Sequence, residues 1–116
     1  MNWSNIRYFK QDEFRCKCCG KEEMQQHFVE HLDEIRYRTG LRMVIHSGYR
    51  CEKHDAEVNG KGNHSQGCAA DIECIGMTTR HILLKHFTSS FPRVGVSKNF
   101  IHVDECMDHP GGCWVY

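Results

Sequence analysis

The hydrophobic pattern of this chain changes its period near residue 40, and this change limits the folds that it can adopt. From about Glu22 to Arg38 the apolar residues recur at helical spacing, and Gly40 supplies a stop for the helix. The following run LRMVIH (41–46) predicts a strand, and CAADIECI (68–75) predicts another. The apolar residues that set the helical spacing are Met24, Phe28, Leu32 and Ile35.

Two more helices and a hairpin complete the expected elements. CEKHDAEVNG predicts a short helix ended by Asn59 and Gly60, and Thr78 or Thr79 can cap a helix that runs to about Ser89. RVGVSKNFIHVDEC has two β-branched runs around a Ser-Lys-Asn turn, which predicts an antiparallel hairpin. Because helices and strands do not alternate in a βαβ rhythm, we expect an α+β fold, a small antiparallel sheet with helices packed mainly on one face.

The charges of the chain are balanced, with 15 basic and 15 acidic side chains among 116 residues. This balance implies no basic face and argues against nucleic acid as the main partner. The start MNWSNIRYFK has no apolar stretch long enough for a signal peptide or an anchor. We therefore expect cytoplasmic synthesis, no membrane association and a monomer, with release by another agent if the protein acts outside the cell.

Two segments carry residues that suit a metal ion. His64 lies in the glycine-flanked loop GNHSQG, where we expect Gly67 to let the backbone pass close to whatever His64 binds, and Asp71 follows in a strand. In NFIHVDEC, strand alternation places His102 and Asp104 on the face away from the core. His64, Asp71 and His102 would give zinc three ligands and leave a fourth position for water, as a catalytic site requires. The other interpretation is a solvated loop histidine and a satisfied surface histidine.

Three motifs in one order resemble the zinc D-alanyl-D-alanine carboxypeptidases. They are SGYR at 47–50, H-x-x-G-x-A-x-D at 64–71 and FIHVD at 100–104. That family includes phage endolysins with L-alanyl-D-glutamate or related specificity, and it shares its fold with the hedgehog signalling domain. EFRCKCCG (13–20) is similar to a phage and prophage branch of the family. The resemblance implies one zinc peptidase domain over 1–116, with a Cys-rich N-terminal segment (1–21) before the catalytic core (22–116).

The resemblance also implies roles for single residues. His64, Asp71 and His102 would hold one catalytic zinc ion. Arg50 would bind the substrate carboxylate or the oxyanion, for which its fixed fork of donors is suited, and Ser47 is a further candidate for substrate contact.

The general base is less clear from the sequence. Many relatives have an acidic residue at the position of Asn99, and Asn99 cannot accept a proton. Asp104 is the nearest replacement as base, and its competing role is to orient His102.

The expected activity is hydrolysis of D-amino-acid-containing peptide bonds in bacterial peptidoglycan, with the stem peptides as substrate. A DD-carboxypeptidase and an endopeptidase of endolysin type are both consistent with the motifs. Such a protein would act at the cell wall after release, or as part of a virion. The alternative is a hedgehog-like zinc module that is weakly active or inactive and has a binding or virion-structural role, because the acid is absent at Asn99.

The eight cysteines leave several states open. Cys16, Cys18 and Cys19 lie within four residues, and Cys16-x-x-Cys19 has the spacing of a zinc or redox pair. Cys51 is a candidate partner, as are Cys106 and Cys113. A structural metal site with a second zinc ion, a disulfide and free thiols all fit these positions. Cys68 and Cys74 need no function beyond that of small hydrophobic residues.

HFVEH (27–31) matches the inverted zinc-peptidase pattern H-x-x-E-H. The apolar stripe of its helix predicts that this helix packs against the core. His27 and His31 lie at the edge of that stripe. The chain also offers neither the length of a protease of that class nor an obvious third ligand. We therefore expect HFVEH to be structural.

Overall fold

A computed structural model of the protein describes residues 1–58 and 60–116. Short 3₁₀ turns lie at Trp3–Asn5, Gln11–Phe14 and His64–Gln66. The helices are α1 (Gln26–Thr39), α2 (Glu52–Glu57) and α3 (Met77–Ser90), and the strands are β1 (Ile45–Ser47), β2 (Ala69–Glu73), β3 (Arg93–Val96), β4 (Phe100–Asp104) and β5 (Gly112–Val115). The expected end of α2 at Asn59 falls outside the described residues.

The five strands form one sheet in the order β1-β2-β4-β3-β5. The neighbours β1–β2, β2–β4 and β3–β4 are antiparallel, which confirms the α+β class and the predicted hairpin. The C-terminal WVY, which carried no assignment from the sequence, contributes to β5, and β5 runs parallel to β3. This differs from the wholly antiparallel expectation. The reason is topological, because β4 ends opposite Arg93 and the chain re-enters the sheet at the same end of β3.

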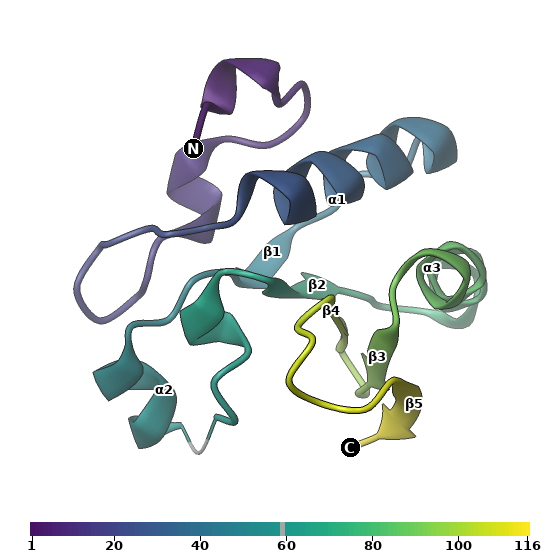
Figure 1. Cartoon of the computed structure of the whole chain (residues 1–116). Helices are drawn as coiled ribbons and strands as arrows, with labels where there is room; N and C mark the ends of the chain where they lie inside the picture. Colours follow the sequence, from purple (N-terminus) through teal and green to yellow (C-terminus); the bar gives the residue numbers. More distant parts are fainter. Residues whose placement is uncertain (59) are drawn as a thin grey trace.

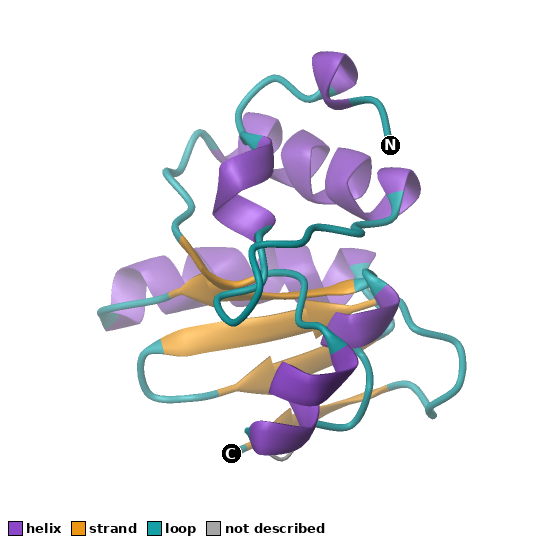
Figure 2. Cartoon of the chain, turned by 90° about the vertical axis from the view of Figure 1, so that its left-hand side faces the viewer, coloured by secondary structure: helices purple, strands orange, loops and turns teal. Residues whose placement is uncertain are grey.

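Helices α1 and α3 and the sheet enclose the core. In Figure 2, α3 lies behind the strands and α2 in front of them, while Figure 1 shows α1 above the sheet. The apolar stripe predicted for α1 is confirmed, since Phe28, Leu32 and Ile35 are almost fully buried. None of the helices in the described part of the chain has the length and apolar character needed to cross a bilayer.

The N-terminal segment is part of the same core. Ile6, Phe9 and Phe14 are buried in one cluster with residues of α1 and the sheet. The Asp33 carboxylate of α1 accepts hydrogen bonds from the backbone N–H groups of Arg7 (3.0 Å) and Tyr8 (2.9 Å).

Gly67 has a packing role that the sequence did not indicate. Its φ is +76°, and a Cβ on this residue would collide with the carbonyl oxygen of Glu23. The backbone of Gly67 also accepts a hydrogen bond from Gln25 N (2.9 Å). The glycine therefore allows close packing against the segment that leads into α1.

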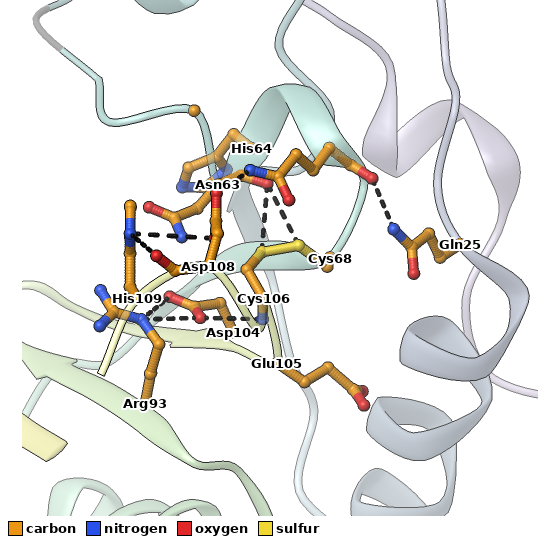
Figure 3. The surroundings of a disulfide bond; sticks show 12 residues. Gln25, Asn63, His64, Cys68, Arg93, Asp104, Glu105, Cys106, Asp108 and His109 are labelled. Carbon is orange, nitrogen blue, oxygen red and sulfur yellow. Dashed lines mark hydrogen bonds and ion pairs between the residues drawn. A yellow bond between two sulfur atoms is a disulfide. The ribbon is translucent and has the colours of Figure 1, made fainter. Parts of the chain in front are cut away.

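A disulfide joins Cys68, before β2, to Cys106, after β4 (Figure 3). It lies just beyond the first residue pair between these strands, Ala69 and Asp104. Both sulfurs are close to the carbonyl oxygen of Asn63, at 3.6 and 3.7 Å. The expectation that Cys68 is only a small hydrophobic residue was wrong, whereas Cys74 is a buried free thiol. A cross-link between residues 38 apart is expected to stabilise the fold by about 4 kcal/mol.

Candidate metal centre

Three side chains that lie far apart in the sequence converge on one face of the sheet. Asp71 Oδ1 is 2.9 Å from His102 Nδ1 and 3.5 Å from His64 Nε2. One ligand atom from each residue lies within 4.8 Å of the other two. His64 and His102 are buried, and Asp71 is partly exposed.

The sheet register places two of these residues side by side. Asp71 at the middle of β2 is directly paired with His102 at the middle of β4, so both side chains leave the same face. His64 comes from the 3₁₀ turn that precedes β2, and its carbonyl accepts a hydrogen bond from Arg50 N (3.3 Å). The loop after β1 and the loop before β2 are thereby joined beside the cluster.

Hydrogen bonds on the far side of each imidazole fix the tautomers. His64 Nδ1 lies 2.8 Å from the Gly48 carbonyl oxygen, which can only accept, so Nδ1 carries the hydrogen. His102 Nε2 lies 2.6 Å from Asp104 Oδ2 and donates to that carboxylate. With these far-side protons in place, His64 Nε2 and His102 Nδ1 face Asp71, where they can either donate a proton to its carboxylate or, once deprotonated, bind a metal ion. Bonds of this kind orient histidine ligands in metal sites.

The electrostatics of the cluster follow from this arrangement. Burial alone would raise the pKa of Asp71, but the hydrogen bonds and charges of His102 and His64 hold that pKa well below its ordinary value. Burial would lower the pKa of His102, whereas Asp104 and Asp71 raise it above the ordinary value. Three acceptor atoms that face one another in this way require a cation between them, either a proton or a metal ion.

The donor set suits zinc. Two imidazole nitrogens and one carboxylate oxygen are ligands that zinc prefers, and three protein ligands leave the position that a catalytic site needs for water. A thiol-only site would close that position. The cluster is therefore consistent with a zinc site that is open to substrate.

Asp104 is fully buried and has several partners. Besides His102, its carboxylate contacts the Arg93 guanidinium (Nε to Oδ1 2.9 Å) and accepts a hydrogen bond from Cys106 N (3.2 Å), as Figure 3 shows. Burial would raise the pKa of Asp104, but His102 and Arg93 lower it below the ordinary value. Of the two roles expected for Asp104, these contacts favour orientation of His102 over proton transfer.

Asp104→Asn is expected to weaken zinc binding by about 10–100-fold, the usual effect of removing a partner that orients a histidine ligand. Chelator competition on the folded variant measures this change. The matched control is Asp108→Asn, at an exposed carboxylate four residues later. A variant with unchanged zinc affinity and reduced kcat would instead point to Asp104 as the base.

An open cleft of about 440 Å³ gives access to the cluster. Arg50 lines it, and Arg50 Nε lies 3.6 Å from Asp55 Oδ1, a buried carboxylate of α2 that also accepts a hydrogen bond from Gly62 N (2.9 Å). The other residues expected at the site lie differently. Ser47 is paired with Asp71 in the sheet but is not part of the cleft lining, and Asn99 is exposed in the turn between β3 and β4.

Several residues of the cleft were missed by sequence reasoning. Two are basic, Lys61 and Arg93, and three are aromatic, Phe100, Trp114 and Tyr116. The Arg93 guanidinium lies 4.8 Å from the ring centroid of Trp114. The alternation of Trp114 and Tyr116 is the signal that was available, because in a strand these two side chains share a face. Arg93 had no such signal, since its position depends on the pairing of β3 with β4.

The HFVEH motif lies outside this cleft, on α1. Its helix packs into the core as expected, yet Glu105, just after β4, contacts both histidines. His27 Nδ1 is 3.0 Å from Glu105 Oε2, and His31 Nδ1 is 3.5 Å from Glu105 Oε1. Glu105 is a partner of these histidines that the sequence did not indicate. Among the described residues these three still do not form a group whose ligand atoms all approach within 4.8 Å.

Two imidazoles and one carboxylate that converge in an open cleft define a candidate mononuclear centre of the type used by metal-dependent hydrolases. Comparison with known families agrees. The chain belongs to the Peptidase M15 family, whose model matches residues 7–104. The match contains all three candidate ligands, and membership supports a metallopeptidase. No curated protein matches the chain.

Proposed function

We propose that this protein is a zinc-dependent peptidase that hydrolyses D-amino-acid-containing peptide bonds in bacterial peptidoglycan, as a DD-carboxypeptidase or an endopeptidase of endolysin type. Its substrates would be the stem peptides, reached at the cell wall after release from the cell. The observation that carries this proposal is the His64–Asp71–His102 cluster, which shares one cleft with Arg50.

The charge of the cleft supports a substrate with carboxylate groups. Three basic side chains line it, Arg50, Lys61 and Arg93, and Asp71 is the one acidic side chain among the described residues of the lining. Peptidoglycan stem peptides carry free carboxylates, which such a lining would attract. The three aromatic side chains of the cleft lining offer flat surfaces for the apolar parts of a peptide.

Each residue of the site has a role in this mechanism. A bound zinc ion would supply a Lewis acid and a water of lowered pKa. His64, Asp71 and His102 would hold the ion, while the Gly48 carbonyl and Asp104 would keep the two imidazoles in the required tautomers. Arg50, oriented by Asp55, donates hydrogen bonds to the substrate carboxylate or to the developing oxyanion.

Mass-spectrometric analysis of purified muropeptides, incubated with the protein with and without zinc, tests the proposal. Loss of a terminal D-alanine would define a carboxypeptidase, and cleavage inside the stem or a cross-link would define an endopeptidase. Both products should depend on zinc and disappear with a chelator. Zinc-loaded protein that leaves every muropeptide intact would contradict the proposed activity.

One observation favours a second candidate, a zinc module that binds peptides without cleaving them. No carboxylate apart from Asp71 lines the described part of the cleft, so the usual acidic base is absent there. A base contributes about 10²–10⁴-fold in rate. Saturable binding of muropeptides by zinc-loaded protein, without product, would favour this binding role.

A further inference from the structure

A second group of metal-ligating side chains lies apart from the cleft cluster. Cys16 and Cys19 belong to the turn after Gln11–Phe14, and Cys51 is the N-cap of α2. Although 35 residues separate Cys16 from Cys51, the three sulfurs lie within 4.8 Å of one another. Cys16 is almost fully buried, and all three thiols are free of disulfides.

Backbone N–H groups point at these sulfurs. Cys51 N donates to Cys16 Sγ, and His54 N donates to Cys51 Sγ, both at 3.4 Å. N–H groups directed at sulfur stabilise a thiolate far more than a neutral thiol.

The turn itself is closed in a way that holds the cysteines together. Gly20 N donates to the Cys16 carbonyl (2.8 Å), and Cys16 N donates to the Lys21 carbonyl (2.7 Å). Gly20 has a φ of +78°, a conformation that glycine adopts without strain. This geometry brings residues 16 and 19 of the C-x-x-C pair to the same side of the turn.

We propose that Cys16, Cys19 and Cys51 bind a structural zinc ion, with Cys18 as the fourth ligand. Tetrahedral zinc with Zn–S bonds of about 2.3 Å places its sulfurs about 3.8 Å apart, and this spacing lies within the 4.8 Å that bounds the three sulfurs. A disulfide would use only two of three converging sulfurs. Three adjacent thiolates without a cation would repel one another.

Cys18 lies in the same turn as Cys16 and Cys19, outside the group of three sulfurs that lie within 4.8 Å of one another. It also lies within 4.8 Å of ligand atoms of His54 and Glu57, so these two side chains are the competitors for the fourth position. A thiolate matches the three sulfur ligands already in place and closes the site against water.

The site would connect the N-terminal segment to the substrate-binding side of the cleft. Cys51 directly follows Arg50, and Arg50 N is hydrogen-bonded to the His64 carbonyl. Zinc at the cysteines would therefore hold the loop that carries Arg50 against the turn at residues 16–20. This role is structural and is independent of whether the cleft cluster is catalytic.

Cobalt substitution of the full chain separates the two sites, because only thiolate ligands give sulfur-to-cobalt charge-transfer absorption in the near ultraviolet. Wild-type protein should bind two metal equivalents and show this absorption. Asp71→Ala should lose one equivalent and keep the absorption, and Cys51→Ser should lose one equivalent and the absorption. Cys113→Ser, at an exposed free cysteine outside the group, is the matched control and should behave as wild type.

Thiol titration of zinc-loaded wild-type protein provides a measurement that needs no variant. Four cysteines should react only after a chelator is added. Cys18→Ser should weaken metal binding at the thiolate site. Loss of this metal in His54→Ala, with full binding in Cys18→Ser, would overturn the assignment of the fourth ligand. Absence of charge-transfer absorption, or a disulfide among these cysteines in the purified protein, would overturn the site itself. Hydrolysis of muropeptides does not enter any of these readouts.

Discussion

Asp71→Ala is expected to remove zinc from the cleft and hydrolysis together. The variant leaves two imidazoles, and it deletes the only negative charge among the three candidate ligands. A general base alone is worth about 10²–10⁴-fold in rate, and the metal would supply the nucleophile as well. We therefore expect kcat/KM for muropeptide hydrolysis to fall by more than about 10⁴-fold, with a parallel loss of zinc measured by elemental analysis.

The control for this variant is Glu73→Ala. Glu73 lies two residues further along β2, on the same face, and contacts His46 (3.2 Å) instead of the cluster. It removes one carboxylate from the same strand and should keep both zinc and activity. His64→Ala should repeat the result of Asp71→Ala from a separate loop. Full hydrolysis by either ligand variant would exclude the cluster as the catalytic centre.

The parts of the fold that follow from local pattern were predictable. The stripe of Phe28, Leu32 and Ile35 defines a helix whatever surrounds it, and the β-branched runs around residues 97–99 define a hairpin. The start of α1 at Gln26 was not predictable, because the backbone of Gln25 is extended and its N–H group donates to the carbonyl of Gly67, which is distant in the sequence. The parallel pairing of β5 was also not predictable, since it depends on which sheet edge remains free once β4 has inserted between β2 and β3.

The same distinction applies to the candidate site. Spacing along the chain indicated His64, Asp71 and His102, because the residue types and the strand alternation of β4 are local features. What orients them is not local. The partners Gly48 and Asp104 depend on strand register, and the Cys68–Cys106 disulfide forms between segments that only the β2–β4 pairing brings together. Similarly, Glu105 reaches His27 and His31 only because the end of β4 passes beside α1.

Arg50→Ala is expected to reduce kcat by about 10²–10³-fold while zinc content stays at the wild-type level, since loss of one donor to a developing oxyanion has an effect of this size. Arg50 lines the cleft but is not one of the three ligands, so zinc should remain bound. Arg50→Lys keeps the positive charge but lacks the fork of donors, so its kcat should fall less than that of Arg50→Ala. Arg38→Ala, at an exposed arginine of α1, is the control and should have no effect on kcat.

The substrate can distinguish the two roles expected for Arg50. If the guanidinium binds the substrate carboxylate, amidation of that carboxylate should lower kcat/KM strongly for the wild-type enzyme. It should lower kcat/KM little for Arg50→Ala, because the two changes remove the same contact. If it stabilises the oxyanion, the two losses should add in free energy. Arg50 also contacts Asp55, and without it a buried carboxylate loses its partner, so we expect Tm to fall as well. If Arg50→Ala has a lower Tm but unchanged kcat and KM, Arg50 is only a structural partner of Asp55. The cleft would then have no assigned residue that binds substrate.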